Sequence, residues 1–222
     1  MCYSPEADLV AGVVVGAIGV DALRHVEDRR YLPLAAVPIV LATHQLIEAA
    51  AWWGLQDRVS QATGESAVTA YLIIALGIVP LLVPFAVMRS EPNPVRQRWM
   101  TPFVWMGLVV AVALLTGMAT GGYSASIGGR FLAYEIATPG GEIIGVLYVL
   151  AVCTPFLLSS QQRLVLFGLI NVLAVAVLTL LLSSGLISLW CVWAAISSVV
   201  VARHIREVSG VTRTRTHRIA TG

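Results

Sequence analysis

The sequence predicts an all-α integral membrane protein with seven transmembrane helices. Of the 222 residues, 58% are apolar and only 12% are charged, whereas a soluble domain carries about a quarter charged residues. The apolar residues form long runs, and about 20 such residues cross the hydrocarbon core of a bilayer. The arginines gather in alternate loops, as in proteins that cross the membrane repeatedly. We therefore expect a multi-pass protein of the cell membrane, of the bacterial inner-membrane type.

The first span follows a short polar leader, in which Ser4 suits an N-cap, Pro5 suits the first helical position, and Glu6 and Asp8 suit the positive end of the helix dipole. In the third span, Pro80 and Pro84 should bend the helix. The seven predicted spans cover residues 7–23, 32–54, 67–88, 101–120, 142–158, 164–182 and 186–202, within a transmembrane domain of residues 1–203.

The apolar run from Leu164 to Ala202 must contain two of these spans. As a single helix it would measure about 60 Å, which is twice the thickness of the hydrocarbon core. Ser183-Ser184-Gly185 is the expected break. The chain then ends in a basic cytoplasmic tail, residues 204–222, where we expect contact with anionic lipids of the bilayer.

The arginines predict the orientation. Twelve of the fourteen lie in the loops after the first, third and fifth spans or from Arg203 to the end of the chain, and only Arg58 and Arg130 lie on the other side. By the positive-inside rule, the N-terminus is outside and the C-terminus is cytoplasmic. The chain has no lysine, which excludes a retinal or PLP Schiff base. We expect no nucleic-acid partner, and the sequence leaves the oligomeric state open.

The longest polar interruption separates the fourth and fifth spans. Residues 121–141 are rich in glycine at both ends and have a β-prone centre at residues 130–136. Two alternatives fit this extracellular loop: a surface hairpin that forms a lid, or a connector folded back over the mouth of the bundle. We favour the lid.

The candidate functional site is a pair of ionisable residues inside the second span. His44 and Glu48 are four residues apart, so they share one face of the helix. His44 should lie near the midplane and Glu48 one turn closer to the outer interface, which Trp52 and Trp53 mark. Ionisable groups at this depth are costly and usually serve an ion site, a proton relay or a substrate pathway.

Other side chains could join this pair at the outer mouth. Removal of Met1 would leave Cys2 with a free α-amine and a thiol, and imidazole, carboxylate and thiolate together suit Zn, Cu or Fe. Our first hypothesis is therefore a metal site made of Cys2, His44 and Glu48, in which the leader folds back and Cys2 lies closer to Glu48 than to His44. The supporting candidates are Ser4, Gln45, Asn171 and Glu142.

Three alternatives remain open. Glu48 could be the titrating group of a proton-coupled transporter or sensor, with His44 as its relay partner. The chain could also be a non-catalytic subunit of a larger membrane complex. The simplest alternative is structural, with His44 and Glu48 bonding to each other and to Gln45 or Asn171 to tie the second helix into the bundle. Whether the protein is an enzyme stays open.

The beginning of the chain resembles an uncharacterised family of bacterial multi-spanning membrane proteins. These proteins begin M-C-[FY]-S, as in Met1-Cys2-Tyr3-Ser4, and carry H-Q-x-x-E in the second span, as in His44-Gln45-Leu46-Ile47-Glu48. The resemblance covers about the first sixty residues. It implies that Cys2, Ser4, His44 and Glu48 belong to one recurring unit, and it supplies no activity.

Overall fold

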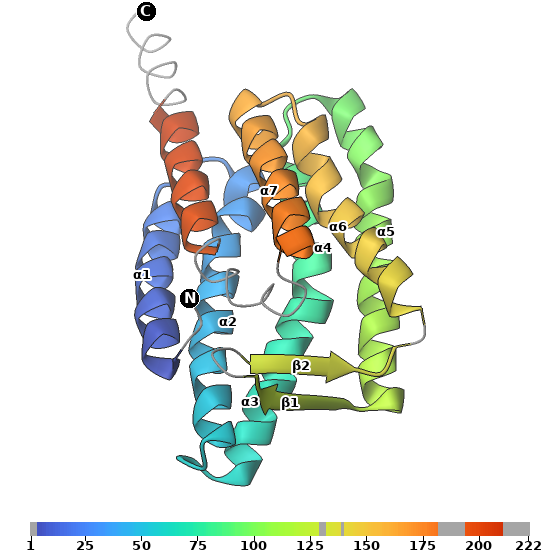
Figure 1. Ribbon diagram of the computed structural model, residues 1–222. Helices are drawn as coiled ribbons and strands as arrows, with labels where there is room; N and C mark the ends of the chain where they lie inside the picture. The colour runs from blue at the N-terminus through green and yellow to red at the C-terminus, as the bar shows by residue number, and fades with distance from the viewer. Residues whose placement is uncertain (1–3, 129–131, 139, 182–193, 211–222) are drawn as a thin grey trace, which may run out of the picture.

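The computed structural model describes residues 4–128, 132–138, 140–181 and 194–210. Within these residues the chain is mostly helical, with one short two-stranded hairpin (Figure 1). The elements are α1 (Pro5–Arg24), a 3-10 turn (Arg29–Tyr31), α2 (Leu32–Leu55), α3 (Gln61–Ile73), a π turn (Ile74–Ile78), α4 (Val79–Ser90), α5 (Pro94–Gly121), β1 (Tyr123–Ile127), β2 (Leu132–Ile136), α6 (Gly141–Leu158), α7 (Gln162–Leu181) and a last helix at residues 194–210.

Successive helices of the bundle run in alternating directions (Figure 1). For this purpose α3, the π turn and α4 count as one continuous helix, residues 61–90. The start of α1, the α2–α3 loop and the hairpin therefore lie at one end of the bundle. The loops at residues 25–31, 91–93 and 159–161 lie at the opposite end. The predicted break at Ser183-Ser184-Gly185 lies outside the described residues.

Four of the described helical segments are long and apolar enough to cross a membrane: Arg29–Leu55, Gln61–Ser90, Pro94–Gly121 and Gly141–Leu158. The π turn in the second of these has a clear cause. Pro80 has no N–H to donate, so its ring interrupts the hydrogen bonds of the helix and leaves a carbonyl oxygen without its helical donor. The Tyr148 hydroxyl of α6 donates to the carbonyl oxygen of Ala75, at 2.9 Å. A neighbouring helix thus satisfies the backbone that the proline disrupts.

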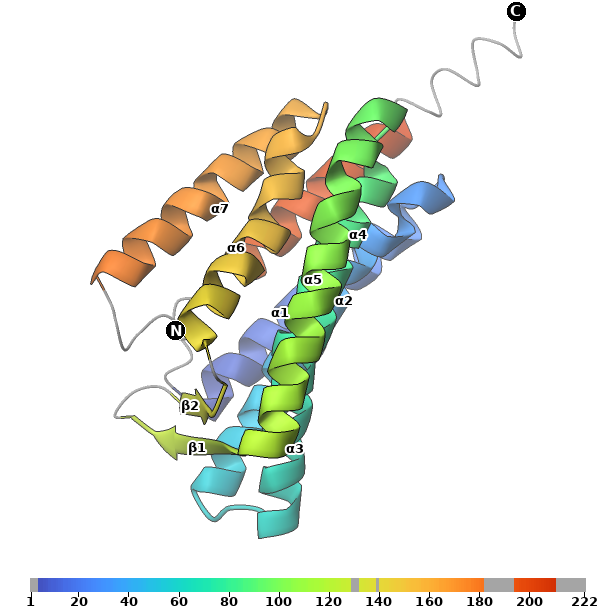
Figure 2. The ribbon, with the colours of Figure 1, turned by 90° about the vertical axis from the view of Figure 1, so that its right-hand side faces the viewer.

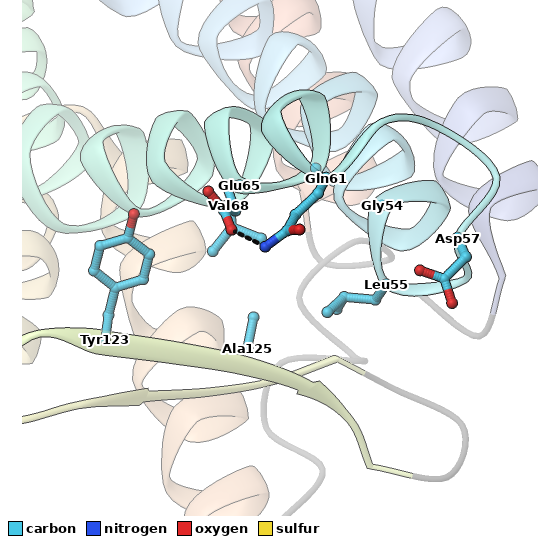
Figure 3. Close-up of a pocket in the computed structure, with 9 residues that line it drawn as sticks. Gly54, Leu55, Asp57, Gln61, Glu65, Val68, Tyr123 and Ala125 are labelled. Atoms are coloured by element: carbon cyan, nitrogen blue, oxygen red, sulfur yellow. Dashed lines mark hydrogen bonds between the residues drawn. The ribbon is translucent and has the colours of Figure 1, made fainter.

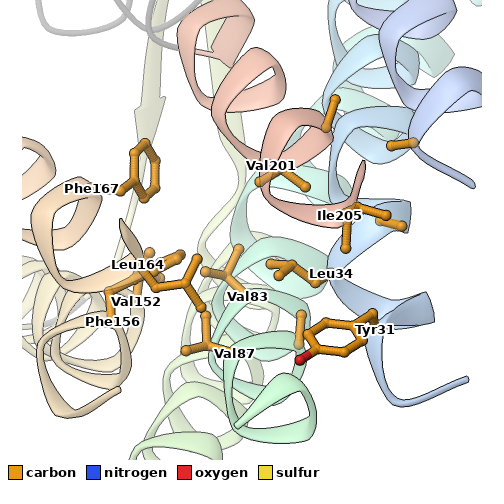
Figure 4. Packing of buried hydrophobic residues seen from close by; sticks show 14 of the residues in the cluster. Tyr31, Leu34, Val83, Val87, Val152, Phe156, Leu164, Phe167, Val201 and Ile205 are labelled. Atoms are coloured by element: carbon orange, nitrogen blue, oxygen red, sulfur yellow. The ribbon is translucent and has the colours of Figure 1, made fainter. Parts of the chain in front are cut away.

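The largest apolar core of the described residues joins seven helices: α1, α2, α4, α5, α6, α7 and the last helix. It contains Leu34 from α2, Val83 from α4, Phe156 from α6, Leu164 from α7 and Ile205 from the last helix (Figure 4). A view turned by 90° shows that the helices run roughly parallel to one another (Figure 2). This core lies toward the end of the bundle that carries most of the arginines.

A buried carboxylate fixes the loops at that end. Glu91 has no solvent exposure. It accepts hydrogen bonds from the Asn93 N–H at 3.0 Å, from the Ser159 hydroxyl at 2.8 Å, and from the Ser160 N–H at 2.8 Å and the Ser160 hydroxyl. Arg96 adds hydrogen bonds to the carbonyl oxygens of Leu158 and Ser159, at 2.9 and 2.8 Å. The α4–α5 and α6–α7 loops are therefore tied together.

The segment after α5 confirms the predicted hairpin. β1 and β2 pair antiparallel, from Tyr123 opposite Ile136 to Ile127 opposite Leu132. The hairpin is anchored in the bundle, because Leu132 is fully buried against residues of α2 and α3. The Tyr123 hydroxyl also forms a hydrogen bond with the Thr69 hydroxyl of α3. The hairpin thus packs across the end of α2 and α3.

Candidate functional site

A cluster of buried polar side chains lies where α1 and α2 pack together. Asp8 of α1 is 0% exposed, and His44, Gln45 and Glu48 of α2 are 4%, 2% and 1% exposed. The helices approach closely because of Gly12, where an added Cβ would lie 2.7 Å from the Leu46 side chain. This contact brings the Asp8 and Glu48 carboxyl groups close enough to repel each other when both are ionised.

Aromatic residues surround the two carboxyl groups. The Trp52 indole lies near Asp8, and the Tyr71 hydroxyl of α3 lies near Glu48. Both rings are almost completely buried. Three helices therefore contribute to the cluster, and its carboxyl groups lie among aromatic rings that exclude bulk water.

His44 belongs to a stack of three rings. Its imidazole lies on the Tyr71 ring, with centroids 3.9 Å apart and planes at 21°, and Tyr71 lies on Tyr134, with centroids 4.6 Å apart and planes at 16°. Tyr134 comes from β2, so the hairpin supplies the outermost ring. Burial raises the pKa of the Tyr134 hydroxyl above its ordinary value, and nearby Glu48 and Asp8 raise it further. Tyr134 therefore stays protonated at neutral pH.

Two buried polar atoms of this stack have no hydrogen-bond partner within the described part of the chain. They are Nε2 of His44 and the hydroxyl oxygen of Tyr134. Buried polar atoms without a partner are uncommon in folded proteins and often mark places where water, an ion or a ligand binds. The stack thus presents polar atoms that a small polar partner could satisfy.

The structure places the predicted site residues in different parts of the molecule. His44, Gln45 and Glu48 lie in the buried cluster. Ser4 caps α1 as predicted, since its side-chain oxygen accepts a hydrogen bond from the Ala7 N–H at 3.2 Å. Cys2 lies outside the described residues, so its role as a ligand stays a prediction.

Two supporting candidates lie in other surroundings. Asn171 of α7 donates a hydrogen bond to the Cys153 sulfur of α6 at 3.3 Å. It lines a small apolar cavity of about 60 Å³ with core residues such as Val83 and Phe156. Glu142 is exposed in the first turn of α6. These contacts do not link Asn171 or Glu142 to the buried cluster, so their supporting role stays a prediction.

The sequence interpretation missed Asp8, Tyr71 and Tyr134. Asp8 was predicted to serve the dipole of α1 in a polar leader, but it is fully buried beside Glu48. A signal for this burial was present, because Asp8 shares the helical spacing of Gly12, Val15, Gly19 and Ala22. All five residues form the buried face of α1.

Within the described residues, no group of three or more His, Cys, Asp or Glu side chains is arranged to hold a metal ion. Asp8, His44 and Glu48 thus lie near one another without forming a ligand set of their own. The predicted metal site with Zn, Cu or Fe therefore depends on Cys2.

The long apolar helices make this a multi-pass membrane protein. The chain belongs to a family of unknown function (DUF6629), whose model matches residues 1–216. The expected membership of a family without a known activity is confirmed, and the match covers nearly the whole chain. The M-C-[FY]-S and H-Q-x-x-E motifs as marks of that family stay a prediction. Neither the comparison with curated proteins nor the comparison with solved structures finds a match.

Proposed function

We propose that this protein is a seven-span membrane protein that binds a cation between α1 and α2, with Asp8 and Glu48 as the charged groups of the site. One observation carries the proposal: two carboxyl groups from different helices lie together at 0% and 1% exposure. Two adjacent carboxylates repel strongly in a medium of low dielectric, and a bound cation lowers this repulsion. In this proposal the cation is a proton or a metal ion.

The arginine distribution supports an orientation in which this site lies in the outer half of the membrane. The site is near the end of the bundle that carries the hairpin, and most arginines are near the other end. The expected orientation has the N-terminus outside and the tail in the cytoplasm. A green fluorescent protein fused after Gly222 should therefore fluoresce, because it folds only in the cytoplasm. A fusion that is fully expressed but not fluorescent would indicate the opposite orientation.

If the cation is a proton, the protein is a proton-coupled transporter or sensor. The Tyr71 hydroxyl and the Asp8 carboxyl, both near Glu48, would then stabilise the different protonation states of the pair. His44 is separated from solvent by the Tyr71 and Tyr134 rings on that side. Proton flux into liposomes that contain the protein distinguishes a transporter, which increases the flux, from a sensor, which does not.

If the cation is Zn, Cu or Fe, Cys2 joins the site. Support comes from α1, because Ser4 caps the same helix that carries Asp8 and the leader is attached at this point. Cys2 is only two residues before Ser4, so its Cα lies within about 7 Å of the Cα of Ser4. A thiolate together with carboxylate and imidazole groups suits these metals.

One set of variants tests both forms of the site. Metal content and the infrared carbonyl band of protonated carboxyl groups are measured for the wild type, Asp8→Asn, Glu48→Gln and Cys2→Ser. Glu135→Gln is the matched control, because its carboxyl group is exposed and Glu135 is not among the predicted site residues. Stoichiometric metal that is lost in Glu48→Gln and Cys2→Ser supports the metal form. A metal-free protein with a protonated-carboxyl band that disappears in Glu48→Gln or Asp8→Asn supports the proton form.

The same measurements can overturn the proposal. A metal-free wild type with both carboxyl groups ionised at neutral pH would mean that groups of the chain itself balance their charge. The cluster would then serve to hold α1 and α2 together. Asp8→Asn and Glu48→Gln would in that case lower the unfolding temperature without changing any bound cation.

A further inference from the structure

A cavity of about 330 Å³ lies at the hairpin end of the bundle, separate from the buried carboxyl pair. We name it the outer cavity. Its walls come from the end of α2, the α2–α3 loop, the first turns of α3 and strand β1, and they include Leu55, Asp57, Glu65 and Tyr123 (Figure 3). Its volume is within the range of small-molecule sites.

The outer cavity is acidic. Asp57 and Glu65 are among its lining residues, and none of the lining residues that the structure describes is an arginine. Arg58 follows Asp57 in the chain but forms an ion pair with Glu6 of α1, with 3.5 Å between the charged groups. The Gln61 side-chain amide donates to Glu65 at 2.8 Å and so orients the carboxylate (Figure 3). The cavity therefore favours a ligand with positive charge.

The remaining walls favour an organic rather than a fully hydrated ligand. Leu55, Val68 and Ala125 contribute apolar surface, and Val68 is buried in the core beneath the hairpin. A primary ammonium group can donate up to three hydrogen bonds, which the carboxylates accept while the carbon chain contacts these apolar groups.

The packing around the cavity holds its shape. α2 and α3 touch at Gly54 and Gly64, where a Cβ added to Gly54 would lie 2.3 Å from the Cα of Gly64. On the opposite wall, the hydrogen bond between Tyr123 and Thr69 fixes β1 against α3. A cavity formed before binding loses little conformational entropy when a ligand enters.

From these observations we propose that the outer cavity binds a small aliphatic amine, held through its ammonium group by Glu65 and Asp57. This site does not depend on the cation proposed for Asp8 and Glu48, since none of the described residues that line it belongs to that cluster. The two proposals can therefore fail separately.

Isothermal titration calorimetry of the full-length protein in detergent tests the proposal, with putrescine as the probe. The control ligand is 1,4-butanediol, which has the same carbon chain and no charge. We expect saturable binding of putrescine and none of the diol. Glu65→Gln and Asp57→Asn should each weaken putrescine binding about three- to fivefold, and together about tenfold or more, because both are exposed charges. The backbone at Asp57 has a positive φ of 56°. Asparagine tolerates this conformation, so Asp57→Asn should not disturb the loop.

Two controls keep the result specific. Glu142→Gln removes an exposed carboxyl group that does not line the cavity, so it should bind putrescine as the wild type does. Ala125→Trp keeps both carboxylates but fills the cavity, so it should abolish binding with an unfolding temperature close to that of the wild type. If this variant does not fold, the comparison of Glu65→Gln with Glu142→Gln decides alone.

Three results would overturn the proposal. The diol could bind as well as putrescine, which would remove the role of charge. Glu65→Gln with Asp57→Asn could leave the affinity unchanged, which would place putrescine elsewhere. Magnesium chloride at an equal concentration of charge could displace putrescine completely, which would mean attraction to any cation at an acidic surface.

Discussion

Replacement of Glu91 should destabilise the protein more than replacement of any exposed carboxyl group. The carboxylate is fully buried and accepts hydrogen bonds from Asn93, Ser159 and Ser160. A hydrogen bond to a charged group contributes about 1.5–3 kcal/mol. Glu91→Gln replaces one acceptor oxygen with an amide group that donates, so at least one of these bonds is lost. We expect a loss of about 2–4 kcal/mol, and about 3–5 kcal/mol for Glu91→Ala, which leaves every donor without its acceptor.

Thermal unfolding in detergent measures this effect, with the fluorescence of the six tryptophans as the signal. For a chain of this size, about 2–4 kcal/mol corresponds to a fall in Tm of about 5–15 °C. Glu142→Gln is the control, because its side chain is exposed in α6, and its Tm should change by about 2 °C at most. A Glu91→Gln variant with the Tm of this control would refute the reasoning, since the Glu91 hydrogen bonds would then contribute nothing to stability.

The same hydrogen bonds give the stability a pH dependence. Burial alone would raise the pKa of Glu91, but the hydrogen bonds from Ser160, Asn93 and Ser159 outweigh it and hold the pKa below its ordinary value of 4.5. The pKa of Glu91 is lower in the folded state than in the unfolded state. The stability that ionised Glu91 contributes is therefore fully present above the unfolded-state pKa, and it disappears as the pH falls through the folded-state pKa. The difference in Tm between wild type and Glu91→Gln should therefore be constant near neutral pH and shrink below about pH 4.5. A difference that grows on acidification would contradict this assignment.

The remaining packing predictions use the same unfolding measurement. Gly107→Ala should lower the Tm by about 5 °C or more, because a Cβ would lie 1.9 Å from the carbonyl oxygen of Pro80 in the backbone of α4. Gly145→Ala is its control in α6, since a Cβ there meets nothing within 4 Å, and it should be neutral or stabilising by up to about 1 kcal/mol. Leu132→Ala should cost about 2–4 kcal/mol, because Leu132 is the fully buried anchor of the hairpin; a loss below about 1 kcal/mol would mean that the hairpin is not anchored there.

Hydropathy located the long helices but not their ends. The predicted spans 67–88 and 101–120 correspond to helices at residues 61–90 and 94–121. The extra turns are polar, so an apolar run does not include them. Capping residues set the true starts, because Ser60 accepts a hydrogen bond from the Thr63 N–H, and Asn93 accepts hydrogen bonds at the start of α5. Caps depend on single polar residues, which a hydropathy average does not resolve.

For the candidate site, the sequence predicted which residues share a helix face, but not which residues of other helices contact them. The spacing of His44 and Glu48 predicted a shared helix face, and both residues are buried in the cluster. Their partners come from other elements: Tyr71 of α3 stacks on His44, and Asp8 of α1 lies beside Glu48. Which helices touch depends on side-chain size at crossing points such as Gly12, and the periodicity of one helix does not carry that information.

Tyr134 offers the sharpest test of a contact that no local pattern indicated. Its ring stacks on Tyr71, but its hydroxyl oxygen is buried without a hydrogen-bond partner in the described part of the chain. The ring should therefore stabilise the fold and the hydroxyl should not. An aromatic pair contributes about 0.5–1.5 kcal/mol beyond the burial of its surface, so Tyr134→Ala should cost about 2–4 kcal/mol.

Tyr134→Phe keeps the ring and removes the oxygen, so it should be neutral or stabilising by up to about 1–2 kcal/mol. Thermal unfolding of the two variants side by side separates these contributions. A Phe variant as unstable as the Ala variant would show that the hydroxyl has a partner that stabilises the fold. A Tyr134→Phe variant could also keep a normal Tm and lose the cation proposed for Asp8 and Glu48. The Tyr134 hydroxyl would then belong to that cation site, because cation binding would change while the packing of the ring would not.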